Sequence, residues 1–208
     1  MQILLTAFGP YEGFSENASW HALMEFAKHL PQSPVQVRTR LYPVDFDLVR
    51  ERLREDLSAD YDFALHLGQA PGSAQVRLEA IGLNIGGTTN QRADEYRPLV
   101  NDGAVAYRSR LPLGELAREL REQGIPAAVS FHAGTYLCNA TLYLTHYWAE
   151  KHGLKTQAAF VHLPLTPKQA ILGRPELPFM TSTMAAQALH TVVKALARRE
   201  PAPVAKLA

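Results

Sequence analysis

The chain is poor in cysteine, because Cys138 is the single thiol among 208 residues. One cysteine cannot form a disulfide within the chain, so we expect a cytoplasmic protein whose thiol stays reduced. No apolar run approaches the roughly 20 residues that span a bilayer. The start at Met1-Gln2-Ile3 also lacks the basic residues that open a signal peptide. We therefore expect no membrane partner.

An excess of charge of one sign is also missing. Lysine and arginine number 21 and aspartate and glutamate number 20. This balance argues against a nucleic-acid partner, which needs a basic surplus. The sequence has no Cys-x-x-Cys motif, no two histidines at i, i+4 spacing and no glycine-rich phosphate loop. We therefore expect no metal ion and no cofactor.

Apolar runs and periodic segments alternate along the chain. Short apolar or alternating segments predict strands at residues 3–8, 35–41, 63–67, 127–131 and 158–163. Helical spacing predicts helices at residues 17–30, 46–57, 113–123, 137–152 and 181–199. Residues 76–85 predict one or two further strands, and residues 86–101 a long polar loop.

Strands that alternate with helices are typical of an α/β protein. We predict a three-layer α/β/α sandwich around a mostly parallel twisted sheet, with residues 76–85 as a candidate antiparallel edge. No repeat or linker interrupts the pattern. We therefore predict one domain over residues 1–208, with a frayed tail from about residue 200.

Cys138 is the first candidate for chemistry. It follows the strand predicted at 127–131 and a loop of small residues, and it opens the helix predicted at 137–152. A helix N-terminus favours a thiolate, which is the nucleophilic form of cysteine. Its unpaired amides also suit an oxyanion at an acyl centre. The alternative is a small buried core residue.

His162 is the candidate base. It lies at the end of the strand predicted at 158–163, and binding sites in parallel sheets lie beyond the carboxyl ends of strands. A structural histidine bonded to a backbone carbonyl is the alternative. His66 also ends a predicted strand and is the strongest rival, and His132 remains a second.

Glu79 is the candidate third member of such a site. It stands between apolar residues in a strand-like stretch, where an unpaired buried carboxylate is costly. Pairing with a histidine would fix its tautomer and stabilise the imidazolium. The alternative is a structural ion pair with Arg77, two residues earlier.

Five segments of the chain match, in order, the motifs of one known family. The most specific is Ser130-x-x-Ala133-Gly134-Thr135-Tyr136-Leu137-Cys138-Asn139. The other four are Leu4-Leu5-Thr6-Ala7-Phe8-Gly9-Pro10-Tyr11, Asn17-Ala18-Ser19-Trp20, Gly68-Gln69-Ala70 with Glu79 and Asn84, and Phe160-Val161-His162-Leu163-Pro164 with Pro167 and Gln169. Over nearly its whole length the chain therefore resembles the pyroglutamyl peptidase I (pyrrolidone carboxyl peptidase) family.

The resemblance implies a cysteine exopeptidase that hydrolyses the bond after an N-terminal pyroglutamate (5-oxoproline) in peptides. It implies an α/β/α fold, often in a homotetramer, and a Cys–His–Glu arrangement at Cys138, His162 and Glu79. A pyroglutamate slot would be lined by aromatic residues of the opening loop, by the residues before the nucleophile and by a segment whose backbone contacts the lactam. The implied substrate-binding residues are Phe8, Tyr11, Asn17, Gln69, Tyr136 and Leu137.

The chain departs from the family pattern after Asn84. The family places an arginine near the oxyanion, where this sequence has Thr89, so Arg92 or Arg97 would have to reach in from the loop. This departure favours one alternative, a non-catalytic small-molecule binding protein on the same fold. Another Cys–His amidohydrolase is a further alternative. An apolar patch within residues 163–180 suggests a homo-oligomer, a dimer or tetramer, or else core packing plus a loop.

Overall fold

A central six-stranded sheet organises the computed structural model, which describes residues 1–11, 13–31, 33–88 and 90–199. The predicted frayed tail and Thr89 lie outside the described residues. The strand order is β2 (Gln36–Tyr42), β1 (Gln2–Phe8), β3 (Phe63–Gln69), β8 (Gln157–Leu163), β4 (Val76–Glu79) and β7 (Ala127–Ser130). Strands β2, β1, β3 and β8 run parallel, whereas β4 pairs antiparallel with β8 and parallel with β7.

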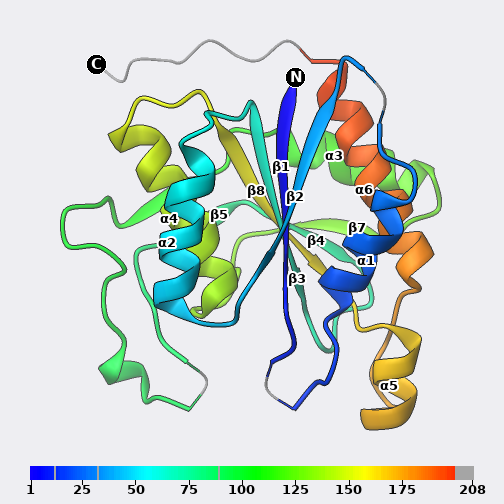
Figure 1. The fold of residues 1–208 in the computed structure, drawn as a ribbon. Coiled ribbons are helices and arrows are strands. Elements are labelled where there is room, and N and C mark those ends of the chain that lie inside the picture. Colours follow the sequence, from blue (N-terminus) through cyan, green and yellow to red (C-terminus); the bar gives the residue numbers. More distant parts are fainter. Residues whose placement is uncertain (12, 32, 89, 200–208) are drawn as a thin grey trace.

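Helices cover both faces of this sheet (Figure 1). Helices α2 (Phe46–Leu57) and α4 (Leu137–Lys151) lie on one face, and α1 (Ala18–Ala27), α3 (Leu113–Glu122) and α6 (Ser182–Ala197) lie on the other. Each face buries its own apolar cluster. The predicted three-layer α/β/α class with a mostly parallel sheet is therefore confirmed.

Local chemistry explains where these elements begin. The inner strands β3 and β8 are buried at every position, as expected for parallel strands covered on both faces. Asp45 and Thr181 accept hydrogen bonds from the first-turn amides of α2 and α6, and Asn17 does the same for α1. These side chains satisfy amides that the helix itself leaves unpaired.

Two expectations about the sheet and its loops were wrong. Strand β4 is antiparallel to β8 but lies inside the sheet, and the edge is β7. Residues 76–85 do hold two strands, as predicted, and the second, β5 (Ile81–Leu83), forms a separate antiparallel pair with β6 (Ala106–Arg108). A short helix, α5 (Pro167–Gly173), occupies part of the region interpreted as loop.

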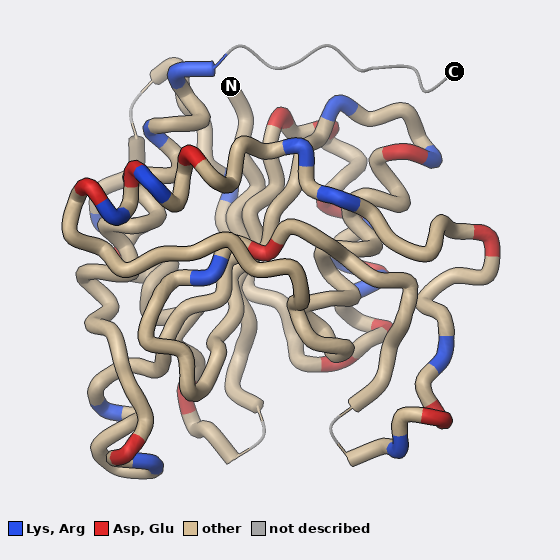
Figure 2. The backbone as a smooth tube through the Cα atoms, turned by 180° about the vertical axis from the view of Figure 1, so that it is seen from behind, with Lys and Arg blue, Asp and Glu red and all other residues tan. Residues whose placement is uncertain are grey.

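The surface carries both signs of charge. Figure 2 shows basic and acidic positions interspersed along the same segments of the backbone. Within the described part of the chain, none of the helices is both long and apolar enough to cross a bilayer.

Candidate active site

The thiol lies at the start of α4, at the carboxyl ends of β3 and β8. Strand β7 runs opposite to β8, so residues 131–136 carry the chain back toward this edge before α4 begins. Within the loop Gly134 has a φ of 81°, a conformation that glycine adopts readily. The helical hydrogen bonds of α4 start with Ala140 N–H donating to Tyr136 O, so the amides of residues 137–139 precede the helical ladder.

The imidazole of His162 is held by a buried carboxylate. His162 Nδ1 and Glu79 Oε1 lie 2.8 Å apart, and the Glu79 side chain has no solvent exposure. Glu79 pairs with Phe160 across the antiparallel β4–β8 ladder, two residues from His162 on the same face. Diagonal neighbours of this kind are within reach of long side chains. The Glu79–Arg77 ion pair is not formed, and Arg77 is exposed.

The thiol and the carboxylate favour the charged form of this imidazole. Burial opposes the imidazolium, but the negative charge of the Cys138 thiolate and a hydrogen bond to it outweigh burial, with a further contribution from Glu79. Together they raise the pKa of His162 to about 9. Since the ordinary value is near 6.5, the imidazole of His162 keeps its proton at neutral pH.

A cavity of about 150 Å³ opens onto the thiol and the imidazole. It brings together eight of the nine residues named from sequence, and Glu79 lies behind His162. The eight are Phe8, Tyr11, Asn17, Gln69, Tyr136, Leu137, Cys138 and His162. Its lining is mostly apolar and aromatic, as suits a small uncharged ring.

The opening loop is tied down by Asn17. Asn17 Nδ2 donates to Gly9 O at 2.8 Å, and Asn17 Oδ1 accepts from both the amide and the hydroxyl of Ser19. Ser19 Oγ in turn accepts from Phe8 N at 3.1 Å. This chain of bonds fixes the backbone on either side of the aromatic side chains at the mouth of the cavity.

Three residues of the site were missed from sequence. Gly68 faces the thiol, because a β-carbon built there would lie 3.1 Å from Cys138 Sγ and 2.7 Å from the Phe160 ring. Val44 lines the cavity, and Phe46 packs edge-on against Tyr136 with ring centroids 5.2 Å apart. Gly68 belongs to a motif that carries the family resemblance, and that motif could have marked it. Nothing in the sequence around Val44 and Phe46 indicates that they lie at the cavity.

The rival histidines and arginines lie elsewhere. His66 is fully buried between the hydroxyls of Thr6 and Thr145, and burial lowers its pKa to about 3. It is a structural histidine. The Arg92 guanidinium bonds Asp94, and Arg97 Nη1 donates to the carbonyls of Asp94 and Tyr96. His132 is exposed on the loop before the nucleophile.

A cysteine thiol beside a carboxylate-paired imidazole, at the carboxyl edge of an α/β/α sandwich, defines a cysteine hydrolase. Comparison with known proteins narrows the class. The family model for pyroglutamyl peptidase matches residues 1–199. The chain therefore belongs to the pyroglutamyl peptidase family, whose members are cysteine exopeptidases that remove an N-terminal pyroglutamate.

Known pyrrolidone carboxyl peptidases are similar to this chain in sequence and structure over nearly its whole length. A pyrrolidone-carboxylate peptidase from Brachyspira hyodysenteriae is 33% identical over 201 residues, covering 93% of this chain and 98% of that protein. The crystal structure of pyrrolidone carboxyl peptidase from Fervidobacterium islandicum superposes with a TM-score of 0.88 and 32% identity, covering 95% of this chain and 99% of the other. A mutant of the Pyrococcus furiosus enzyme gives a TM-score of 0.88 at 29% identity, with coverages of 96% and 99%.

Proposed function

We propose that this cysteine exopeptidase uses Cys138 as nucleophile, His162 as acid and base, and Glu79 as the carboxylate that orients His162. The single observation that carries the proposal is the 2.8 Å bond between His162 and Glu79, set behind the cavity that His162 shares with the thiol. No other histidine of the described residues lines that cavity.

The reaction follows from this arrangement. The Cys138 thiolate attacks the carbonyl that joins pyroglutamate to the next residue, and the amides of the loop and first helical turn stabilise the oxyanion. One such donor contributes about 3 kcal/mol. His162 then gives its proton to the departing amine, which leaves a thioester. Water attacks the thioester with His162 as base, and pyroglutamate and the free thiolate are released.

The cavity suits the lactam. Pyroglutamate has no free amine, so its recognition needs no charged group. Phe8, Tyr11, Tyr136 and Leu137 would enclose the ring, and the backbone of Gln69 would contact the lactam amide. The volume of about 150 Å³ favours a small ring over a larger acyl group.

The setting of the enzyme is also a proposal. We infer a single domain over residues 1–208 and a cytoplasmic location, which the one reduced cysteine favours. Exposed apolar side chains on and after α5 support a homo-oligomer, a dimer or tetramer: Ile171, Leu172 and Phe179. Light scattering coupled to gel filtration would give the mass, and a monomer at micromolar concentration would contradict the oligomer.

Release of a fluorophore from a pyroglutamyl amide tests the catalytic roles. Wild-type protein should cleave this substrate and leave a prolyl amide intact, and Cys138→Ala should be inactive. Turnover that survives in Cys138→Ala would overturn the assignment of the nucleophile. Folded, reduced wild-type protein without turnover would favour the non-catalytic binding protein instead.

A further inference from the structure

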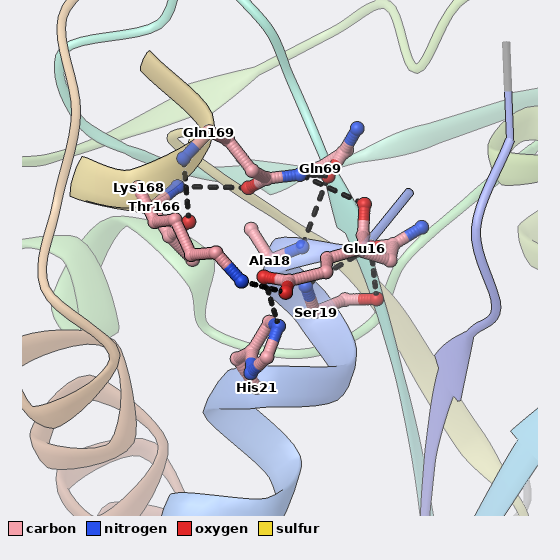
Figure 3. A network of polar contacts seen from close by, with 9 residues as sticks. Glu16, Ala18, Ser19, His21, Gln69, Thr166, Lys168 and Gln169 are labelled. Carbon is pink, nitrogen blue, oxygen red and sulfur yellow. Dashed lines mark hydrogen bonds and ion pairs between the residues drawn. The ribbon is translucent and has the colours of Figure 1, made fainter. Parts of the chain in front are cut away.

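Gln169 uses its whole side-chain amide to join three segments that are distant in sequence (Figure 3). Its Oε1 accepts from Thr166 N at 2.9 Å, which closes the capping box of α5. Its Nε2 donates to Glu16 O at 2.8 Å and to Gln69 Oε1 at 2.9 Å. The residue is buried, so these bonds are sheltered from water.

Gln69 links this network to the cavity. Side chains alternate along a strand, and Gly68 faces the thiol, so the Gln69 side chain projects from the opposite face of the sheet. There Gln69 Oε1 accepts from both Ala18 N and Gln169 Nε2, each at 2.9 Å. Gln69 Nε2 is buried without a hydrogen-bond partner among the described residues. The orientation of this amide therefore depends on the two donors that hold its oxygen.

The same network holds the opening loop. Glu16 precedes Asn17, which anchors the loop to Gly9. A groove of about 410 Å³ lies between residues 13–16 and α5. The two segments therefore meet through polar contacts at Glu16 more than through close packing. One of these, from Lys168 to the Glu16 carboxylate, is at the surface, where an ion pair contributes little.

We propose that Gln169 is a positioning residue for the pyroglutamate slot, a role that rests on the function proposed above. It locks the loop that carries Tyr11 and Asn17 to the strand end that carries Gln69, and so fixes the distance between the two walls of the slot. The site needs an amide at this position. A glutamate lacks both donors, and an asparagine is one methylene shorter.

The test measures KM and kcat separately, because a positioning residue should affect substrate binding more than the chemical step. Gln169→Met keeps the buried volume but removes all three hydrogen bonds, and Gln169→Glu keeps only the acceptor for Thr166 N. We expect each to raise KM for the pyroglutamyl amide about tenfold while kcat changes less than about threefold. Alkylation of Cys138 by iodoacetamide should keep its rate, because Gln169 contacts neither the thiol nor His162.

Two comparisons separate positioning from general damage. Lys168→Met, on the same helix, breaks only the exposed ion pair and should leave KM within about twofold of wild type. If Gln169 acts through Gln69, the double variant Gln69→Met/Gln169→Met should have a KM no higher than Gln69→Met alone. Additive effects, or wild-type KM in both Gln169 variants, would overturn the proposal.

A binding readout keeps the two proposals apart. Free pyroglutamate should raise the Tm of wild-type protein and raise it less in Gln169→Met. If wild-type protein shows no turnover but free pyroglutamate raises its Tm, the catalytic assignment fails. The Tm shifts of wild type and Gln169→Met then still decide the positioning role. An equal shift in wild type and Gln169→Met refutes that role, and absence of both turnover and shift refutes the slot itself.

Discussion

His162 Nδ1 lies 2.8 Å from Glu79 Oε1, and the carboxylate beneath it is sealed from solvent. The second oxygen, Glu79 Oε2, has no hydrogen-bond partner among the described residues. The charge of Glu79 is therefore directed at one group, the imidazole. A carboxylate buried in this way is costly unless a cation stabilises it, which couples the protonation of His162 to the integrity of the site.

Replacing the carboxylate tests that coupling. Glu79→Gln keeps the shape but removes the charge and offers the imidazole either a donor or an acceptor. We expect kcat/KM for a pyroglutamyl amide to fall about 100-fold or more, because the imidazolium loses its partner. Steady-state kinetics measure the loss. Glu119→Gln, whose partner Arg198 directly follows α6, should stay within about twofold. A change below threefold in Glu79→Gln would contradict the role.

The pH profile follows from the raised pKa of His162. Below pH 9 the folded imidazole keeps the proton that the proposed mechanism transfers to the departing amine, and above pH 9 this proton is lost. We expect kcat/KM to decline on the alkaline side near pH 9, and Glu79→Gln to move this limb to lower pH. A limb at the same pH in both proteins would show that the titrating group is not His162.

Gly68 leaves room for the thiol. Gly68→Ala would place a methyl group against the Phe160 ring and 3.1 Å from Cys138 Sγ, so one of them must move. We expect kcat to fall at least about tenfold and stability to fall by about 1–3 kcal/mol. Gly114→Ala, in α3 with open space at that position, is the control and should be neutral or stabilising. Wild-type kinetics in Gly68→Ala would show that the thiol tolerates displacement.

The two arginines of the 86–97 segment are engaged elsewhere. Since Arg92 bonds Asp94 and Arg97 Nη1 bonds two loop carbonyls, we expect neither guanidinium to stabilise the oxyanion. Arg92→Ala and Arg97→Ala should each keep kcat within about threefold. The same fluorogenic assay measures this, and a loss of about 100-fold in either variant would place that guanidinium at the reacting carbonyl.

Two buried histidines predict acid sensitivity. Burial lowers the pKa of His66 to about 3 and of His146 to about 4. Between the unfolded value near 6.5 and these values the unfolded chain binds more protons, so stability falls as pH falls. Each group contributes a slope of about 1.4 kcal/mol per pH unit in its window. His146→Leu should flatten the decline of unfolding free energy between pH 6 and 4, and an unchanged slope would contradict this.

The elements with strong local signals could be predicted from sequence. Helix α2 has the predicted bounds, Phe46–Leu57, because its cap at Asp45 and its apolar spacing lie within the segment itself. The antiparallel direction of β4 agrees with the expectation for residues 76–85, but its place inside the sheet had no local signal, because that place is decided by pairing with β8, a strand far along the chain. Helix α5 did carry a signal: Thr166 and Gln169 form a capping box, which the neighbouring prolines obscured.

The candidate site shows the same division. The motifs drew attention to Cys138, His162 and Glu79, which the fold places around one cavity and its rear wall. Val44 and Phe46 could not be found this way, because only the fold brings the start of α2 and the residues before it beside Tyr136. Nothing in the residues around Gln169 indicated that its amide would span to Glu16 and Gln69.

The position of β8 has a consequence for biosynthesis. Among the described strands it comes last along the chain, yet it lies between β3 and β4 in the middle of the sheet. Until β8 is synthesised, β3 and β4 lack the partner that they share, and unpaired strand edges of this kind favour aggregation. Because β8 also carries His162, the proposed base, the strand that fills the gap between β3 and β4 also supplies this imidazole, and we expect a chain stalled before β8 to be neither fully paired nor active.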